Sequence, residues 1–268
     1  MSERGAAPAT SRTAERIVDL LTLLGSRDQP FTALEIAAEV GIPKSSTHQL
    51  LNYLATRDVV RYDPVQRTWG LGVAVFQLGA AYKRSRPLEV VGRGILVDVA
   101  QATSTTTHLA VLEGRDVLYV DKQQQRTGTG TTQLVTETGV RLPAHLTAVG
   151  RALLSTFSDE RLTELYRDYE FVRRTSLGPE SLTELLRDLA RVRADGFAIE
   201  SGLTTAGITC LAAPVFEQGP EAVAALGITF VTDQMSPEQV DQHARTVQDF
   251  AHRLSADLGW APGTSEGQ

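Results

Sequence analysis

The chain has 268 residues, enough for two domains, and its 42% hydrophobic and 22% charged residues are typical of a soluble globular protein. No apolar run approaches the roughly 20 residues that a membrane helix needs. The segment from Met1 to Thr13 lacks the apolar core of a signal peptide. A lone cysteine, Cys210, excludes an internal disulfide and fits a reducing compartment. We therefore expect a cytoplasmic protein with no membrane partner.

The net charge of −6 argues against a nucleic-acid binder, because such proteins are usually basic. The charge is unevenly distributed, however. Residues 1–80 contain eight Lys and Arg against eight Asp and Glu, whereas residues 81–268 contain 18 against 24. The acidic excess therefore lies outside the first 80 residues. A neutral segment has to concentrate positive charge locally to bind DNA, and dimerisation would double its contacts.

Residues 12–24 form the first predicted helix, because apolar residues recur there at helical spacing. These residues are Ile17, Leu20, Leu21 and Leu24. A second helix follows Thr32, which we expect to be the N-cap of a capping box completed by Glu35. The predicted buried face of this helix comprises Leu34, Ile36, Ala37 and Val40. Gly41 then turns the chain.

The third predicted helix runs from Pro43, a favourable first helical residue, to about Arg57. Two short helices joined by a Gly-containing turn, the second with a polar outer face, indicate a helix-turn-helix. In this motif the N-terminal residues of the second helix face base edges, which suits Lys44, Ser46 and Gln49. Ser45 is the preferred candidate for a phosphate contact. The DNA-binding candidates on this helix are Lys44, Ser45, Ser46, His48, Gln49 and Asn52.

Residues 59–62 and 67–71 are predicted strands of a β-hairpin around a Pro-containing turn. A hairpin attached to a helix-turn-helix is a wing, and Arg61 and Arg67 are its candidates for contacting a phosphate or the minor groove. We expect this winged helix-turn-helix to cover residues 11–73. The same elements also suit a protein-interaction module that never meets DNA, so the local features leave both functions open.

Residues 74–87 are predicted to form a linker helix, because the stretch from Leu71 to Tyr82 is apolar and rich in small residues. Its apolar surface exceeds what one thin helix buries alone, which indicates a seam between two copies of the chain. Packing of the helix on its own wing is an equally compatible interpretation.

Residues 88–258 are predicted to form a second domain of the α+β class. Its expected strands cover residues 105–112, 116–122, 197–200, 208–216 and 222–231, and its expected helices cover residues 88–102, 142–157, 181–195 and 236–258. Thr147 is a predicted helix cap, and Ser181 with Glu184 and Ser236 with Gln239 are predicted capping boxes. Because strands and helices come partly in blocks, we expect an antiparallel sheet. Residues 259–268 are predicted to be a disordered tail.

Cys210 together with His108 or His145 would suit a Cys–His hydrolase, but no nucleophile signature surrounds the thiol. It lies in an apolar β run, where the pKa of a thiol rises. The five histidines are too far apart for a metal-ligand spacing. The Gly- and Thr-rich segment 127–132 lacks the Gly-Lys-Ser/Thr of a phosphate loop, and we interpret it as a flexible loop. The sequence therefore predicts no enzyme, no cofactor and no metal site.

The run FTALEIAAEVGIPKSSTHQLLNYL from Phe31 to Leu54, and WGLG at residues 69–72, resemble the winged helix-turn-helix of the IclR family of bacterial regulators. LPAHLTAVGRALL from residue 142 resembles a second signature of that family, and residues 196–200 with 207–215 resemble a third. The similarity covers about residues 12–258. The family usually has Arg at the position of Gln49 and Lys at that of Arg151. Since Gln favours adenine where Arg favours guanine, the base preference should differ here.

This resemblance implies a sequence-specific DNA-binding transcription regulator, for which we favour a repressor. It implies self-association as a dimer or tetramer and binding to double-stranded operator DNA. It also implies a GAF-like C-terminal domain that binds a small organic or aromatic acid, which controls the affinity for the operator. A different class of function remains as the alternative: a ligand-binding protein or an enzyme whose N-terminal module mediates assembly only.

The resemblance places the effector between the sheet and the segment 142–151. The implied effector-binding residues are Leu142, Ala148, Val149, Glu200, Ile208, Cys210, Gly227 and Thr229. Backbone amides of Ala148 and Val149, at a helix start, would meet the acid, and Glu200 would accept a hydrogen bond from a ligand hydroxyl. An inert buried thiol at Cys210 and a solvated charge at Glu200 are the alternatives. Leu142 and Ile208 suit plain core positions equally well.

Overall fold

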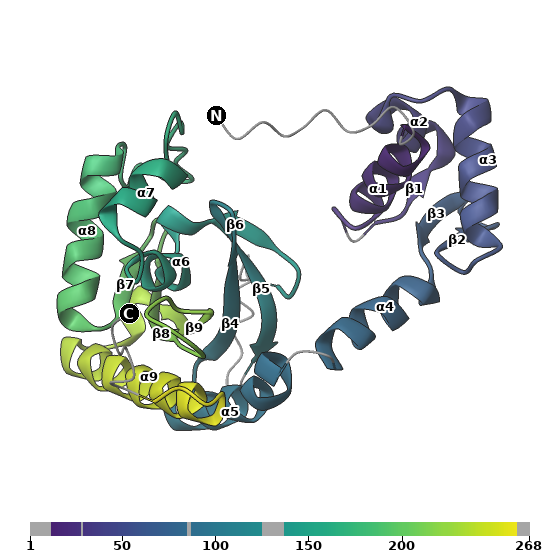
Figure 1. The fold of residues 1–268 in the computed structure, drawn as a ribbon. Helices are drawn as coiled ribbons and strands as arrows, with labels where there is room; N and C mark the ends of the chain where they lie inside the picture. The colour runs from purple at the N-terminus through teal and green to yellow at the C-terminus, as the bar shows by residue number, and fades with distance from the viewer. Residues whose placement is uncertain (1–11, 28, 85–86, 125–136, 262–268) are drawn as a thin grey trace. The chain divides into compact units, whose positions relative to one another are not determined.

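The computed structural model describes residues 12–27, 29–84, 87–124 and 137–261. The chain divides into two compact units, residues 1–85 and 86–268 (Figure 1). Each unit contains its own hydrophobic core, so each is described by itself. The predicted loop at residues 127–132 lies outside the described residues, as does most of the predicted tail.

The N-terminal unit combines helices with a small antiparallel sheet of strand order β1-β3-β2. Its elements are α1 (Arg12–Leu24), β1 (Phe31–Thr32), α2 (Ala33–Val40), α3 (Lys44–Ala55), β2 (Val60–Asp63), β3 (Thr68–Leu71) and α4 (Val73–Arg84). Leu20, Ile36 and Leu51, one from each of the first three helices, are fully buried and belong to the core that includes Trp69 of the wing. This packing is the winged helix-turn-helix that the apolar spacing predicts.

The start of α2 follows the predicted capping box. Thr32 Oγ1 accepts a hydrogen bond from the Glu35 amide, and the Glu35 carboxylate accepts one from the Thr32 amide at 2.7 Å. Phe31 pairs with Trp69, which adds β1 as a third strand where the sequence indicates a two-stranded hairpin. A two-residue strand is too short to carry a periodic signal. The backbone before the helix nevertheless has to be extended, because Thr32 is its N-cap.

Three details of the helix-turn-helix correct the sequence expectations. Leu34 is 58% exposed and does not belong to the buried face of α2. Pro43 is the N-cap of α3 instead of its first residue, and the helix ends at Ala55 instead of Arg57. Pro43 suits the N-cap because φ is −57° there and its missing N–H costs no hydrogen bond at a helix start.

The C-terminal unit is built on a six-stranded sheet of order β6-β5-β4-β9-β8-β7, in which every pair is antiparallel. Its strands are β4 (Thr106–Glu113), β5 (Asp116–Gln123), β6 (Arg141–Pro143), β7 (Ala198–Ser201), β8 (Ile208–Val215) and β9 (Ala224–Val231). Its helices are α5 (Pro87–Thr103), α6 (Ala148–Leu154), α7 (Asp159–Leu165), α8 (Leu182–Asp195) and α9 (Pro237–Asp257), with 3₁₀ turns η1 (Ala144–Leu146) and η2 (Thr232–Gln234). The fold is α+β and GAF-like, which confirms the predicted class.

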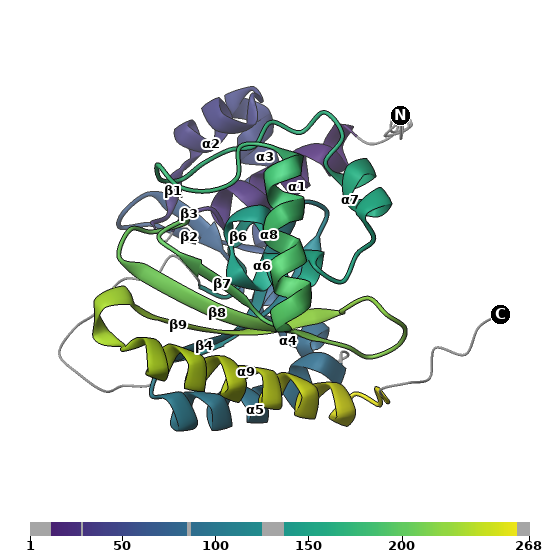
Figure 2. The same ribbon diagram turned by 90° about the vertical axis from the view of Figure 1, so that its left-hand side faces the viewer.

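Helices cover both faces of this sheet. Helices α5 and α9 lie side by side on one face, and α6 and α8 lie on the other (Figure 2). Alternate residues of a strand point to opposite faces, so Leu211 packs toward α9 and Ala212 toward α6. A strand buried on both faces is predominantly apolar, which explains the apolar run over residues 211–215 of β8.

The predicted helix over residues 142–157 is interrupted. Residues 141–143 form β6, a 3₁₀ turn follows, and α6 begins only after Thr147, which caps it as predicted by accepting a hydrogen bond from the Gly150 amide at 3.0 Å. Gly150 is required there, because an added Cβ would lie 2.2 Å from the Ala144 carbonyl oxygen.

The two other predicted boxes differ. Ser236 and Gln239 form a complete capping box. At Ser181 only one of the two hydrogen bonds of a capping box forms: the Ser181 side chain accepts from the Glu184 amide. The Glu184 carboxylate accepts a hydrogen bond from the Glu180 amide instead of the Ser181 amide. Past α9, Trp260 stacks on Phe216 with ring centroids 5.0 Å apart, so the packed chain extends one residue or more into the range expected to be a tail.

Candidate nucleic-acid interface and ligand site

The turn between α2 and α3 fixes the direction of the second helix. Gly41 caps α2 with φ 68°, a left-handed conformation that favours glycine. The amide of Ile42 donates to the Ala37 carbonyl at 3.1 Å, and the Ile42 side chain is buried in the turn. Helix α3 therefore starts immediately after an anchored turn, as a recognition helix requires.

Helix α3 has a buried and an exposed side. Thr47, Leu51 and Leu54 face the core. Ser45, Gln49 and Asn52 follow the same helical spacing on the opposite side, and all are exposed. Lys44 and His48 are exposed as well, whereas Ser46 is half-buried beside α1. The structure thus places the six predicted DNA-binding residues of α3 outside the core, with Gln49 near the middle of the outer side.

The two predicted arginines of the wing flank its turn. Arg61 lies on β2 opposite Gly70, and Arg67 precedes β3 with φ 55°. The Asp63 carboxylate holds the turn between the strands by accepting hydrogen bonds from the amides of Val65 and Gln66. Both arginines are exposed, so the wing presents two cations on a short, internally hydrogen-bonded hairpin.

In the C-terminal unit, the sheet face under α6 gathers most of the predicted effector-binding residues. Glu200 pairs with Cys210, and Cys210 pairs with Thr229, so these three residues form one row across β7, β8 and β9. Gly227 lies two residues before Thr229, and a Cβ added there would lie 2.9 Å from a methyl carbon of Val149. The start of α6 therefore rests directly on this part of the sheet.

Two residues that the sequence did not assign to the effector site lie beside the row. His108 on β4 pairs with Gly227, and its Nε2 lies 2.9 Å from Thr229 Oγ1, which also lies 3.2 Å from Cys210 Sγ. Tyr119 on β5 contacts the His108 ring edge to face, with centroids 5.5 Å apart. A polar residue inside an apolar strand was the available signal for His108, but only the pairing of strands distant in sequence brings it to Thr229.

Burial favours the neutral forms of His108, Tyr119 and Cys210. It lowers the pKa of His108 to about 3 and raises the pKa values of Tyr119 and Cys210 well above their ordinary ranges. Burial also raises the pKa of Glu200, against the hydrogen bonds that its carboxylate accepts. The face therefore offers a neutral imidazole, a thiol, a phenol and a hydroxyl, which suit hydrogen bonding to a ligand.

Glu200 is only 4% exposed, so the solvated-charge alternative is wrong. Its carboxylate accepts hydrogen bonds from the Leu203 amide at 3.0 Å and from Thr204 Oγ1 at 3.4 Å. It therefore fixes the loop between β7 and β8. These two contacts leave part of its acceptor capacity for other partners.

The remaining predicted residues lie at the rim of the row or within the core. Ala148 and Val149 are buried in the first turn of α6, and Ile208 is buried at the start of β8. Leu142 lies on β6 in the core between the sheet and α6. His145 has a structural contact, since its Nε2 lies 3.0 Å from the Val172 carbonyl oxygen inside a cluster of aromatic rings.

The arrangement around Cys210 does not suit thiol chemistry. A Cys–His nucleophile needs a thiolate beside an imidazolium, whereas burial here raises the pKa of the thiol and lowers that of His108. Thr229 lies between the two side chains. Within the described ranges, no group of three or more His, Cys, Asp or Glu could hold a metal ion, and no helix is long and apolar enough to cross a membrane.

A winged helix-turn-helix joined to a GAF-like domain with a buried polar row is the architecture of a DNA-binding transcription regulator. Family models agree: the IclR helix-turn-helix domain matches residues 13–64, and the C-terminal domain of the bacterial transcriptional regulator IclR matches residues 80–256. The chain belongs to the IclR family, as the sequence resemblance predicts.

Individual relatives match over nearly their whole length. The transcriptional repressor IclR of Escherichia coli K12 is 26% identical over 257 residues, covering 94% of this chain and 93% of that protein. Among solved structures, an IclR regulator from Alicyclobacillus acidocaldarius aligns with a TM-score of 0.82 at 26% identity, covering 92% and 98% of the two chains. An IclR homologue from Microbacterium hydrocarbonoxydans, in complex with 4-hydroxybenzoate, shares the fold with a TM-score of 0.78 at 21% identity and the same coverage.

Proposed function

We propose that this regulator binds double-stranded operator DNA through α3 and the wing, and that a small acid bound in residues 88–258 controls its affinity for the operator. The observation that carries the proposal is the exposed polar side of α3, opposite a fully packed side, on a helix anchored by the Gly41 turn. Lys44, Arg61 and Arg67 supply cations on the same unit. Phosphate contacts of this kind give most of the affinity of such proteins for DNA.

The effector class rests on the polar row under α6. First-turn amides of a helix have no partner within the helix, so those of Ala148 and Val149 can donate to a carboxylate. Neutral His108 and Thr229 suit a hydroxyl or carbonyl on the same ligand. An aromatic acid, 4-hydroxybenzoate, is bound by the Microbacterium homologue, which supports an organic or aromatic acid as the class to test first.

Self-association is supported by α4. Its apolar residues are largely exposed, namely Val73 at 59%, Phe76 at 75%, Leu78 at 69% and Tyr82 at 43%. These exposures count against packing of the helix on its own wing. A second copy covering α4, in a dimer or as half of a tetramer, would remove this apolar surface from water and hold two helix-turn-helix units together.

We favour repression over activation of transcription, because the matched Escherichia coli relative is a repressor. A regulator of bacterial transcription works where the chromosome lies, so we place the protein in the cytoplasm. The neutral Cys210 and His108 favour ligand binding over catalysis.

A gel shift on the intergenic DNA that flanks the gene tests the proposal. We expect retardation at low salt that weakens steeply as salt rises, and a shifted affinity when 4-hydroxybenzoate or a related acid is added. Absence of retardation at low salt, with and without such acids, would contradict DNA binding. Retardation that no acid changes would contradict only the proposed effector class.

A further inference from the structure

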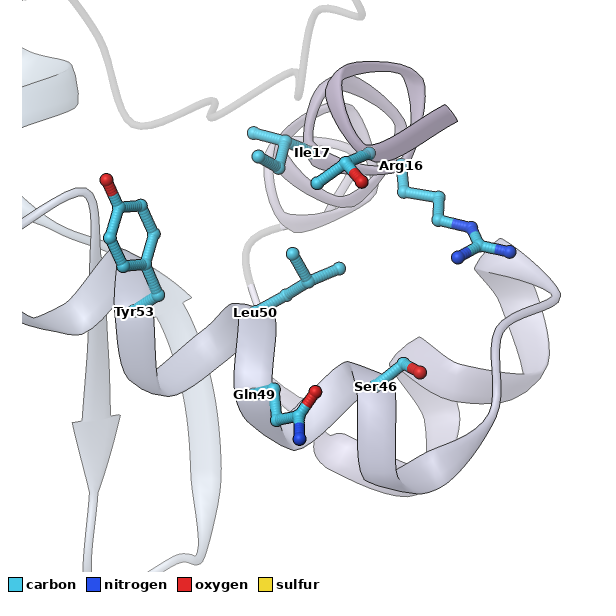
Figure 3. Close-up of a pocket in the computed structure, with 7 residues that line it drawn as sticks. Arg16, Ile17, Ser46, Gln49, Leu50 and Tyr53 are labelled. Carbon is cyan, nitrogen blue, oxygen red and sulfur yellow. The ribbon is translucent and has the colours of Figure 1, made fainter. Parts of the chain in front are cut away.

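A pocket of about 370 Å³ lies between α1 and α3 in the N-terminal unit (Figure 3). Its lining residues are Thr13, Arg16, Ile17, Ser46, Gln49, Leu50 and Tyr53. The DNA contacts predicted from the sequence lie on α3 and the wing, and none of them involves α1. The pocket adjoins the outer side of α3, because Gln49 belongs both to its lining and to the row of exposed residues opposite the core.

The lining combines an apolar floor with a polar rim. Ile17 and Leu50 are half-buried, and Figure 3 shows Leu50 pointing from α3 toward Ile17 of α1. The Arg16 guanidinium reaches out from α1 on the side of Ser46. Thr13, Ser46 and Tyr53 add hydroxyl groups, so the rim carries one cation and several hydrogen-bond donors.

The positive charge in the lining of the pocket favours an anionic ligand. Its lining includes Arg16 but no acidic residue among those that the structure describes, although the chain as a whole is acidic. A DNA strand presents an anionic phosphate beside an apolar deoxyribose. A cation and hydroxyls around a small apolar floor match these two parts together, whereas a neutral apolar ligand would leave Arg16 unused.

We propose that this pocket holds one sugar–phosphate unit of the operator strand beside the major groove, with Arg16 as the phosphate contact. Thr13, Ser46 and Tyr53 donate to the same backbone, and the sugar lies on Ile17 and Leu50. Ser46, half-buried beside α1, thus contacts the backbone instead of the base edge expected for it. This inference rests on the proposed binding of α3 to DNA. It adds α1 to the interface, next to the residue that we expect to read a base.

The test uses the full chain and the operator fragment that it retards. One phosphate contact changes the slope of log K against log salt by about 0.9, which corresponds to roughly 8-fold in affinity at about 0.1 M salt relative to about 1 M salt. Arg16→Ala should therefore lower operator affinity roughly 8-fold per bound subunit and make the salt slope shallower by about 0.9 per contact. The loss should be equal for every base variant of the half-site. Arg16→Lys should retain the slope.

Arg187→Ala is the matched control. It removes the same charge from an exposed position of α8 in the other unit and should leave the slope unchanged. Ethylation of single phosphates should identify one phosphate per half-site whose modification weakens the native protein but not Arg16→Ala.

An unchanged slope for Arg16→Ala, with the native protein still binding, would overturn the inference and leave the proposed function intact. A changed oligomeric state without a changed slope would assign the pocket to a second copy of the chain and would likewise overturn it. Failure of the native protein to retard any DNA would remove the proposed function itself.

Discussion

Gln49 is the residue with the most specific chemistry on the proposed DNA-binding surface. It lies near the middle of the exposed side of α3, so its side-chain amide is accessible to a base edge. A Gln amide pairs bidentately with adenine, whereas the Arg usual in the family pairs with guanine. The amide is uncharged, so the selectivity comes from hydrogen-bond geometry and not from attraction to phosphate.

Replacing Gln49 should change which base is preferred. We expect Gln49→Ala to lose discrimination of about 1–3 kcal/mol at one base pair of each half-site, and Gln49→Arg to shift the preference there from adenine to guanine. Gel shifts on operators that carry each of the four bases at every position measure this. Asn52→Ala, on the same side of the helix one turn further, is the comparison. An unaltered base preference in Gln49→Ala would disprove the base contact.

At the ligand site, the family resemblance predicted Glu200, Cys210 and Thr229 as effector-binding residues. The strand register brings these three into one row. His108 and Tyr119 were not predictable in the same way. They join the row only because β4 pairs with β9 and β5 with β4, across a separation of more than 100 residues in the first case. The local pattern of β4 does not specify that it pairs with β9, so the contact of His108 with Thr229 follows only from the folded sheet.

Elements follow the sequence closely where their signal is local. The complete boxes at Thr32 and Ser236 form as predicted, because a capping box involves only four consecutive residues. The segment after Leu142 follows a tertiary constraint instead. There β6 joins the sheet edge by pairing with β5, and the turn at Ala144 packs against Gly150, so one apolar run becomes a strand, a 3₁₀ turn and a helix.

The cap of α2 should make the stability of the N-terminal unit depend on pH. Hydrogen bonds from the Thr32 amide and hydroxyl, with one from Arg27, lower the pKa of Glu35 from 4.5 to about 2. A carboxyl whose pKa is depressed on folding stabilises fully above the unfolded pKa, and this contribution is lost as the pH falls toward the folded pKa. Glu35→Gln still fits a capping box but does not titrate in this range.

The stability difference between the native protein and Glu35→Gln should therefore shrink as the pH falls from 6 to 3. Urea unfolding followed by Trp69 fluorescence measures it in a Trp260→Phe background, since these two are the tryptophans of the chain. A Thr32→Ala variant, which loses the N-cap hydroxyl, should cost about 1 kcal/mol. A difference for Glu35→Gln that stays constant over this range would show that the depressed pKa does not contribute to folding.

At the scale of the whole molecule, the chain contains two units with separate cores, the first ending with α4 and the second beginning with α5. The sequence predicted both units because each has its own apolar periodicity and its own family resemblance. How copies of the chain would combine could not be predicted in the same way, because an exposed apolar helix indicates an interaction surface without specifying what covers it. Substitutions on helix α4 therefore test how copies of the chain associate.

Phe76 tests whether a second copy covers α4. It is the most exposed of the apolar residues on this helix, and a buried aromatic residue at an interface centre is worth 2 kcal/mol or more, a factor of roughly 30 in association. Phe76→Asp should therefore weaken self-association by at least about 30-fold, which sedimentation across a range of concentrations measures. Operator affinity should fall with it, because two recognition helices bind half-sites about 34 Å apart only when a dimer holds them.

Gln77→Asp is the matched control, because it introduces the same charge at the neighbouring exposed position without removing an apolar side chain. It should leave the mass of the assembly unchanged. If Phe76→Asp also kept its oligomeric state, the interface would have to lie on the C-terminal unit. If it became monomeric but bound the operator as tightly as before, a single winged helix-turn-helix would suffice for recognition. The neutral charge of residues 1–80 argues against this second outcome, since one such unit offers few phosphate contacts.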